Sequence, residues 1–166
     1  MRLQLGCGNQ IFENYINVDY KSLHGVDVQA DIKQLPFKDN SIELIETYHA
    51  FEHIPRQEIS STLSDWFRVL KLDGELIIEL PDFEQNCKDY LDAVERKDWD
   101  ETNMQLAYIY GGDTSASEDA HRWGYSSLSL AGFLYWAGFR DIRSGKPQSY
   151  LTERGACLRI KCRKTK

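Results

Sequence analysis

The chain has 166 residues, which is long enough for one domain with a substantial buried core. Its 42% of hydrophobic residues indicates a soluble globular protein, and no apolar run approaches the ~20 residues that cross a bilayer, so we expect no membrane span. The net charge of −6 argues against DNA or RNA as a partner, because non-specific binding of nucleic acid needs a basic surface.

The four cysteines indicate a reducing compartment. Cys7, Cys87, Cys157 and Cys162 form no C-x-x-C pair, and no local group of His residues has the spacing of metal ligands. We therefore expect free thiols, a cytoplasmic protein and no metal. The first strand candidate begins at once, so we expect no signal peptide. Residues 1–166 contain no repeat and no Pro/Gly-rich linker, which predicts a single domain.

A glycine loop and an acidic residue stand at the ends of the first two strand candidates. Gly6 and Gly8 follow the apolar run of residues 3–5, and a second apolar run ends at Asp19. Glycines let the backbone come close to a ligand, and a carboxylate at this place accepts hydrogen bonds from ribose hydroxyls. A parallel crossover normally needs about a dozen residues and a helix. The connector here is shorter, so we predict a nucleotide site with a shortened first helix.

The elements that follow alternate between strands and helices. The strand candidates are residues 2–5, 15–19, 26–30, 41–46, 74–80, 138–144 and 156–163. Apolar residues at helical spacing behind Pro55 predict a helix before the fifth strand, and Asp82 is the expected N-cap of the helix after it. A further helix is expected over residues 102–110, and Ser127 is expected to cap the last helix, which Gly138 ends. This alternation predicts an α/β sheet.

In open α/β sheets, ligands bind beyond the carboxyl ends of the strands. After the glycine loop, these ends carry Asp19 with Tyr20 and then Asp31. The set suits an adenosine group, because Asp19 can accept from the ribose hydroxyls, Tyr20 offers an apolar face to the base, and Asp31 can accept from the exocyclic amine. The alternatives are a strand cap for Asp19, a surface aromatic for Tyr20 and an ordinary polar turn for Asp31.

The chain resembles class I S-adenosylmethionine-dependent methyltransferases, and most of all their small type 11-like branch, in five segments: LQLGCGN, NVDY, ADIKQLPFKDNSIELI, YHAFEHI and RVLKLDGELIIELPD. The match covers about residues 3–83. The glycine loop alone has little specificity, but all five segments in this order are a strong signal. The resemblance implies a Rossmann-like seven-stranded sheet with helices on both faces and an antiparallel last strand, and it implies S-adenosylmethionine as the cofactor.

The matching positions imply how that cofactor is bound. Gly6, Cys7 and Gly8 would line its methionine and ribose portion, and Asp19 would bind the ribose. For Cys7 we expect only a small residue tolerated beside the glycines, and not a nucleophile. These positions follow the first two strand candidates.

The ends of the next strands would supply the other cofactor contacts. Tyr20 would flank the adenine, and Asp31 with Ile32 would hold its amino edge. Tyr48 and His49, which follow the fourth strand candidate, would lie beside the sulfonium end. Because the carboxyl ends of parallel strands meet at one edge of a sheet, we expect all of these residues at a single site.

The chain departs from the family pattern in two places. Residues 9–14 replace the full helix that relatives have between the glycine loop and the acidic strand end. The chain also starts almost at the motif, without the helices that cover the site from the N-terminal side in relatives. We therefore expect residues 82–125 to act as a lid over the cofactor.

Two histidines are the candidates for general base catalysis. His53 follows the fourth strand candidate next to Glu52, and His121 lies in the segment EDAHRWGY before the last helix. Imidazole has an unperturbed pKa near neutrality, which suits it to accept the proton of a hydroxyl acceptor. The alternatives are that Glu52 or His53 caps the following helix or makes a structural hydrogen bond, and that His121 makes a local hydrogen bond in a packed loop.

We therefore expect methyl transfer from S-adenosylmethionine to a small-molecule acceptor, either a polar metabolite or a sugar-like compound. The alternative is a non-catalytic protein that binds S-adenosylmethionine, S-adenosylhomocysteine or a partner, which the missing helix favours. A dehydrogenase is disfavoured because the loop lacks the G-x-G-x-x-G spacing. Neither nucleic acid nor a membrane is expected as a partner, and a homodimer is left open.

Overall fold

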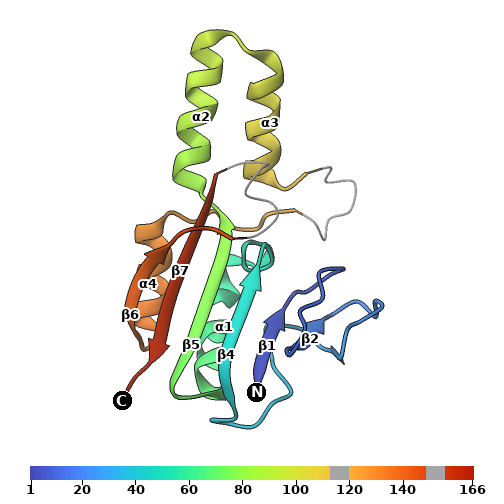
Figure 1. Cartoon of the computed structure of the whole chain (residues 1–166). Helices are drawn as coiled ribbons and strands as arrows, with labels where there is room; N and C mark the ends of the chain where they lie inside the picture. The colour runs from blue at the N-terminus through green and yellow to red at the C-terminus, as the bar shows by residue number, and fades with distance from the viewer. Residues whose placement is uncertain (113–119, 149–155) are drawn as a thin grey trace.

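The computed structural model describes residues 1–112, 120–148 and 156–166. Its described strands form one seven-stranded sheet in the order β3-β2-β1-β4-β5-β7-β6 (Figure 1). The strands are β1 Arg2–Leu5, β2 Ile16–Asp19, β3 Val28–Gln29, β4 Ile42–Tyr48, β5 Leu70–Pro81, β6 Phe139–Gly145 and β7 Cys157–Lys164. The helices are α1 Ile59–Val69, α2 Phe83–Arg96, α3 Trp99–Tyr110 and α4 Ser127–Trp136, with two 3-10 turns, η1 Phe51–His53 and η2 Arg56–Glu58.

The strand directions bring the carboxyl ends of the parallel strands to one edge of the sheet. We call it the functional edge, because ligands of open α/β sheets bind there. Strands β1 to β5 pair in parallel, whereas β7 runs antiparallel to both β5 and β6. This confirms the predicted seven-stranded sheet with an antiparallel last strand. The carboxyl ends of β1, β2, β4 and β5 meet at the upper edge in Figure 1, and the α2–α3 hairpin extends beyond that same edge.

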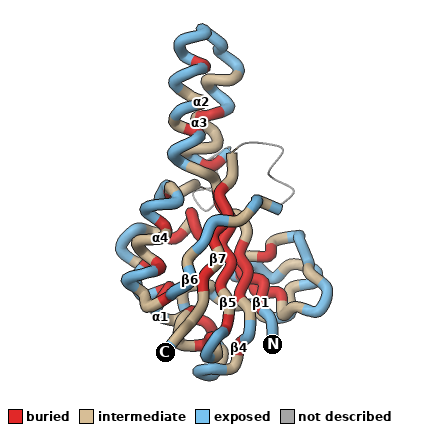
Figure 2. Tube along the Cα trace, turned by 60° about the vertical axis from the view of Figure 1, so that its left-hand side comes forward, coloured by how far each residue is buried: buried red, intermediate tan, exposed pale blue. Residues whose placement is uncertain are grey.

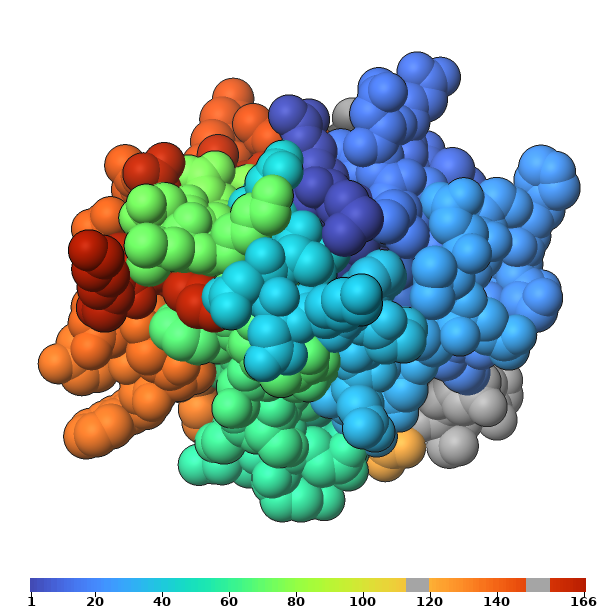
Figure 3. Space-filling view, turned by 90° about the horizontal axis from the view of Figure 1, so that it is seen from below, coloured from blue at the N-terminus to red at the C-terminus, as the bar shows by residue number. Residues whose placement is uncertain are grey.

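The opposite edge of the sheet is closed by short connections, as seen from below in Figure 3. The Glu43 backbone N–H donates to the Met1 carbonyl at 2.8 Å, and the Asn40 backbone N–H donates to the Arg68 carbonyl at 3.0 Å. Lys71 forms an ion pair with Glu43 at 2.9 Å. These contacts join the start of the chain, the end of α1 and the start of β5, away from the functional edge.

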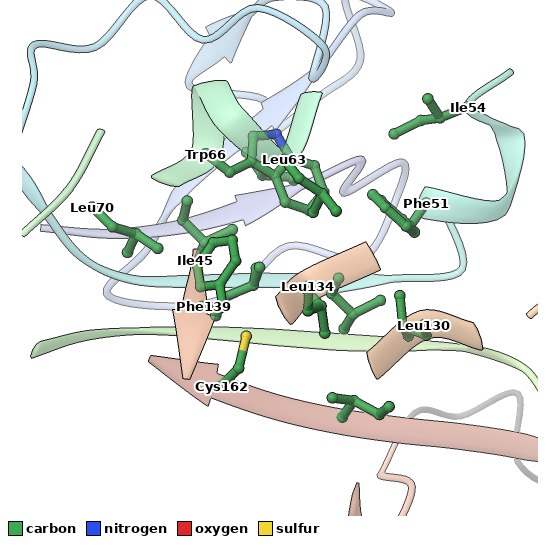
Figure 4. Close-up of a cluster of buried hydrophobic side chains, with 14 of the residues drawn as sticks. Ile45, Phe51, Ile54, Leu63, Trp66, Leu70, Leu130, Leu134, Phe139 and Cys162 are labelled. Carbon is green, nitrogen blue, oxygen red and sulfur yellow. The ribbon is translucent and has the colours of Figure 1, made fainter. Parts of the chain in front are cut away.

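The hydrophobic core lies between the sheet and helices α1 and α4. Leu5 and Ile45 of the central strands are fully buried in this core, as is Trp66 of α1, and Figure 4 shows Ile45 on the side of the sheet that α1 covers. Leu130 and Leu134, one turn apart on α4, complete the layer. Burial of each such side chain contributes about 1.5–3 kcal/mol to folding, so this layer supplies the main driving force for the fold.

The alternate side chains of the central strands are polar. Arg159 and Glu79, on neighbouring strands β7 and β5, are 3% and 0% exposed, and Arg159 Nη1 donates to Glu79 Oε2 at 2.8 Å. Figure 2 shows the central strands as the most buried part of the molecule. The sheet therefore carries a buried ion pair on the side opposite to the hydrophobic layer.

The helical layer differs in one respect from the expectation of helices on both faces. Helices α1 and α4 contact each other and share one face of the sheet, and α2 with α3 forms a hairpin beyond its edge (Figure 1). The physical reason is the length of the first connectors. Residues 6–15 and 20–27 form turns and loops without a helix, which confirms the shortened first crossover.

The helix boundaries follow their capping residues. Asp82 caps α2 as predicted, because its carboxylate accepts from the Gln85 backbone N–H. Ser126 caps α4 in a reciprocal arrangement with Ser129, so the prediction of Ser127 as the cap was wrong by one residue. No helix within the described ranges is long and apolar enough to span a membrane.

Candidate functional site

A cavity of about 520 Å³ opens at the carboxyl ends of β1, β2 and β4. This volume lies in the range of pockets that hold small ligands and cofactors. Most of the residues predicted to bind the cofactor line it, namely Gly6, Gly8, Asp19, Tyr20, Asp31, Ile32 and His49. The lining also includes residues that the sequence did not single out for this role, among them Asn9, Lys33 and Ala50.

Two glycines shape the loop at the floor of this cavity. Gly6 has a φ of +67°, and a Cβ built on it would collide with the side chain of Ala50, just after β4. Gly8 has a φ of +51°, and a Cβ there would meet open space. The loop therefore needs glycine conformations at both positions, and at Gly6 it also needs the missing side chain.

Asp19 holds the glycine loop in place. Its side chain is nearly buried, with Oδ2 accepting from the Gly8 backbone N–H at 2.8 Å and Oδ1 from the Lys21 backbone N–H at 2.9 Å. A carboxylate has about four acceptor positions, so each oxygen keeps one for a ligand in the cavity. Asp19 thus serves both as the predicted strand-end cap and as a potential ligand group.

The loop after β3 forms the opposite wall. The Asp31 carboxylate accepts from the Lys33 backbone N–H at 2.9 Å, as in an ordinary polar turn. The Ile32 carbonyl accepts from Trp66 Nε1 at 2.7 Å, which anchors the loop on α1. Tyr20, at the end of β2, is half-exposed and lines the same cavity. The structure thus brings the three residues predicted near the adenine to one place.

Two other predicted cofactor residues are not among the described lining of this cavity. Cys7 is buried, and burial raises the pKa of its thiol to about 11. The Tyr48 hydroxyl accepts from Arg159 Nη1 at 3.1 Å and so belongs to the polar network of the sheet.

A second cavity, of about 220 Å³, lies at the base of the α2–α3 hairpin. His49 lines both cavities and therefore stands on the wall between them. The second cavity is also lined by Asn86 of α2, Tyr108 of α3, His121 and Cys157. Asn86 is fully buried, and its amide oxygen and nitrogen have no hydrogen-bond partner among the described residues.

Glu52 is the centre of a cluster of histidines at this wall. Its side chain is 3% exposed, and its Oε1 lies 3.6 Å from His49 Nδ1 and 3.8 Å from His121 Nε2. The rings of His53 and His121 pack edge to face with centroids 5.1 Å apart. The structure therefore brings together the two predicted catalytic residues, which are distant in sequence, and neither 3-10 turn shows a side-chain cap.

Backbone contacts hold the two halves of this cluster together. The backbone N–H groups of Arg122 and Trp123 donate to the Glu52 carbonyl at 2.8 and 3.2 Å. His53 Nδ1 contacts the Ala120 carbonyl at 3.1 Å. The segment that begins at residue 120 is thereby fixed against η1. Sequence alone gave no means of pairing these segments, because the α2–α3 hairpin separates them along the chain.

The cluster is charged at its centre. Burial favours the neutral acid, but the contact with His49 and the nearby imidazoles outweigh it and lower the pKa of Glu52. Burial likewise opposes charge on His49, yet its contacts with Cys157 and Glu52 raise the pKa of His49 to about 9. Burial is the main cause that lowers the pKa of His121. At pH 7, a carboxylate therefore faces one imidazolium and one neutral imidazole.

Comparison with known proteins finds a similar protein family. Residues 7–78 match the family model described as "Methyltransferase domain", a segment that holds the glycine loop, Asp19, Asp31 and the Glu52 cluster. The sheet order and the antiparallel β7 agree with that family. Residues 7–78 are therefore similar to the methyltransferase domain of class I S-adenosylmethionine-dependent enzymes. No curated protein sequence matches this chain.

Solved structures of low identity share the methyltransferase fold. A protein from Thermotoga maritima, described as a "SAM-dependent methyltransferase, possible histamine N-methyltransferase", has a TM-score of 0.65 and 21% identity, covering 99% of this chain and 82% of that chain. A SAM-dependent methyltransferase from Methanosarcina mazei has a TM-score of 0.64 and 16% identity, with 99% and 92% covered. One from Archaeoglobus fulgidus has a TM-score of 0.63 and 16% identity, with 98% and 85% covered.

The first cavity fits the family's cofactor, S-adenosylmethionine. Its volume of about 520 Å³ suits a ligand of that size. Gly6 and Gly8 leave backbone rather than side chain at its floor, and Asp19 retains acceptor positions near them. The cavity at Gly6, Asp19 and Asp31, which we name the donor chamber after the methyl donor that it fits, lies beside the second cavity and shares His49 with it.

Proposed function

We propose that this chain is an S-adenosylmethionine-dependent methyltransferase that transfers a methyl group to a polar small molecule bound in the second cavity, which we call the acceptor chamber. The observation that carries the proposal is the shared wall: His49 lines both chambers, so an acceptor here lies next to the donor. Asn86 supports a polar ligand, because its buried amide has no described hydrogen-bond partner and such groups are costly unless a ligand satisfies them.

In the donor chamber, we assign roles to the residues that line it. The backbone at Gly6 and Gly8 would contact the methionine and ribose portion, and Asp19 would accept from the ribose hydroxyls. Asp31 and Ile32 would hold the amino edge of the adenine, with Tyr20 beside the ring. When bound, the cofactor supplies an activated methyl group, so the chain mainly has to align donor and acceptor.

If the acceptor is a hydroxyl group, its proton must also be removed during methyl transfer. We assign this step to His121 or His53, which lie at the wall between the chambers. The proton passes from the acceptor oxygen to an imidazole nitrogen, and the Glu52 carboxylate, 3.8 Å from His121 Nε2, stabilises the imidazolium that forms. An amine acceptor that is already neutral needs less from this group, so a hydroxyl acceptor should depend on it more strongly.

The size of the acceptor chamber and the net charge of the chain favour a small molecule as the acceptor. Its volume of about 220 Å³ holds a sugar-sized or amino-acid-sized compound and not a macromolecule. The chain's net charge of −6 also disfavours nucleic acid. The supported class is therefore polar metabolites with hydroxyl or amino groups.

The test has two stages. First, calorimetry should show that S-adenosylmethionine and S-adenosylhomocysteine bind, and that Asp19→Ala weakens binding by at least tenfold while Asp27→Ala does not. Second, a panel of sugars, amino sugars and amines is screened for formation of S-adenosylhomocysteine. For any acceptor found, Asn86→Ala should raise KM for the acceptor and leave cofactor affinity unchanged.

The outcomes distinguish a methyl-transferring enzyme from a protein that only binds the cofactor. Cofactor binding without turnover on any acceptor would favour the non-catalytic alternative. Equal KM values for the wild type and Asn86→Ala would remove the acceptor chamber from the proposal. Turnover that survives alanine at both His53 and His121 would exclude them as the base.

A further inference from the structure

A buried carboxylate and two imidazoles converge at the wall between the chambers. Glu52, His53 and His121 each offer one donor atom, and these atoms lie within 4.8 Å of one another. Glu52 is 2% exposed, and among the described residues neither of its oxygens has a hydrogen-bond partner. His49 Nδ1, at 3.6 Å, lies beyond hydrogen-bond distance. His49 thus faces Glu52 without a hydrogen bond, and both buried carboxylate oxygens can still accept a ligand.

The backbone fixes the tautomers of both imidazoles. His53 Nδ1 lies 3.1 Å from the Ala120 carbonyl oxygen, and His121 Nδ1 lies 3.3 Å from the Ile109 carbonyl oxygen. A carbonyl can only accept, so each Nδ1 donates its proton and each Nε2 keeps a lone pair. Histidines that bind metals usually have this second contact, which orients the ring and fixes the tautomer.

A small space borders two of the three donors, Glu52 and His121. Its volume of about 10 Å³ is that of about one water-sized probe. Ligand atoms around a tetrahedral ion with bonds of about 2.0–2.1 Å lie about 3.4 Å apart. His121 Nε2 and Glu52 Oε1 are 3.8 Å apart, and all three donor atoms lie within 4.8 Å of one another, so an ion would have to draw them closer together.

We propose that Glu52, His53 and His121 bind one divalent transition-metal ion, with Zn²⁺ as the preferred occupant. Two imidazoles and one carboxylate are a donor set that suits zinc and other first-row transition metals rather than Mg²⁺ or Ca²⁺. Three protein ligands leave at least one position for water or for an oxygen of the acceptor. Binding of the ion does not depend on methyl transfer, so this inference goes beyond the proposed function.

The ion would change the role of the two imidazoles. In the ion-loaded chain Glu52, His53 and His121 would hold the ion, and the ion would supply Lewis-acid activation of an acceptor hydroxyl. In the ion-free chain an imidazole remains available to accept the proton of that hydroxyl. The methyl-transfer proposal therefore stands with or without the ion, and the two can fail separately.

The experiment uses the untagged full chain after treatment with a chelator and dialysis. Zn²⁺ is titrated by calorimetry, bound metal is counted by mass spectrometry, and Co²⁺ is added as a spectroscopic probe of coordination. We expect one ion per chain in the wild type. Glu52→Gln, His53→Ala and His121→Ala should each weaken Zn²⁺ binding by at least about tenfold and alter the Co²⁺ spectrum. His24→Ala is the matched control, because His24 is exposed and lies outside the cluster.

Circular dichroism and S-adenosylhomocysteine binding report whether each variant is folded. If Glu52→Gln does not fold, His121→Ala and His53→Ala decide the question. The proposal is overturned if the wild type binds no Zn²⁺ under these conditions. It is also overturned if folded His53→Ala and His121→Ala bind Zn²⁺ as tightly as His24→Ala, because the ion would then be held elsewhere.

Discussion

Gly6 and Gly8 show how the absence of a side chain can determine the shape of a binding loop. Both glycines have a left-handed backbone, but only at Gly6 does a neighbour, Ala50, occupy the place of a Cβ. The two positions therefore share a conformational requirement and differ in a steric one. This difference makes them a matched pair for experiment.

We predict that Gly6→Ala lowers the free energy of unfolding by about 2–4 kcal/mol, and Gly8→Ala by about 1 kcal/mol. The larger loss at Gly6 adds displacement of Ala50 to the cost of the left-handed backbone. Urea unfolding without cofactor measures both values. Equal losses in the two variants would show that the contact with Ala50 is unimportant.

Cys7 provides a test at the same loop. Burial, together with the negative charge of Asp19, raises the pKa of its thiol to about 11. The thiolate is the reactive form, so a raised pKa keeps Cys7 protonated and unreactive at neutral pH. We predict slow alkylation of Cys7 by iodoacetamide at pH 7–8, with a rate that rises until about pH 11. Peptide mass spectrometry follows this rate beside that of the half-buried Cys87, and fast labelling of Cys7 at pH 7 would contradict the prediction.

At the scale of elements, most of the strands and helices could be predicted from the local sequence. The strand and helix candidates all appear, since each depends on nearby apolar spacing, Gly, Pro or a capping residue. The observed strand boundaries differ from the predicted ones where pairing with a strand distant in sequence determines them. The third strand shortens from the predicted residues 26–30 to Val28–Gln29, because only these residues pair with β2. The fifth strand begins at Leu70, because that residue pairs with Ile42 across an irregularity in β4.

The capping of α4 can be tested directly. Ser126 Oγ accepts from the Ser129 backbone N–H, and Ser129 Oγ accepts from the Ser126 backbone N–H. We predict that Ser126→Ala lowers the free energy of unfolding by about 1 kcal/mol, whereas Ser127→Ala changes it by less than about 0.5 kcal/mol. Thermal unfolding of both variants measures this, and a larger effect at Ser127 would restore the cap predicted from sequence.

The candidate site was less accessible to sequence analysis than the elements. The cavity at the glycine loop could be predicted because its residues follow successive parallel strands, whose ends must meet. The cluster of Glu52, His53 and His121 could not, because no local spacing connects His121 to η1. Its formation depends on the α2–α3 hairpin and on backbone contacts such as that from Arg122 to Glu52. The sequence did not identify Asn86 as a site residue. Its role is suggested only by the burial of its amide group without a described hydrogen-bond partner.

At the scale of the whole molecule, the buried pair of Arg159 and Glu79 ties the antiparallel β7 to the parallel part of the sheet. We predict that Arg159→Met lowers the free energy of unfolding by about 3–5 kcal/mol, because it leaves the Glu79 charge buried. The control is Arg163→Met, whose partner Glu75 is on the same two strands but exposed, with an expected loss below about 1 kcal/mol. Similar losses for both variants would argue against a special role for burial.

The short connector between β1 and β2 has a consequence for the order of assembly. The hydrogen bond from Gly8 to Asp19 spans 11 residues, whereas the contact between His49 and Cys157 spans 108. Contacts between residues close in sequence lose less chain entropy on closure and form sooner. Synthesis also delivers the N-terminal residues first. The nascent chain should therefore be able to form the donor chamber before the acceptor chamber exists.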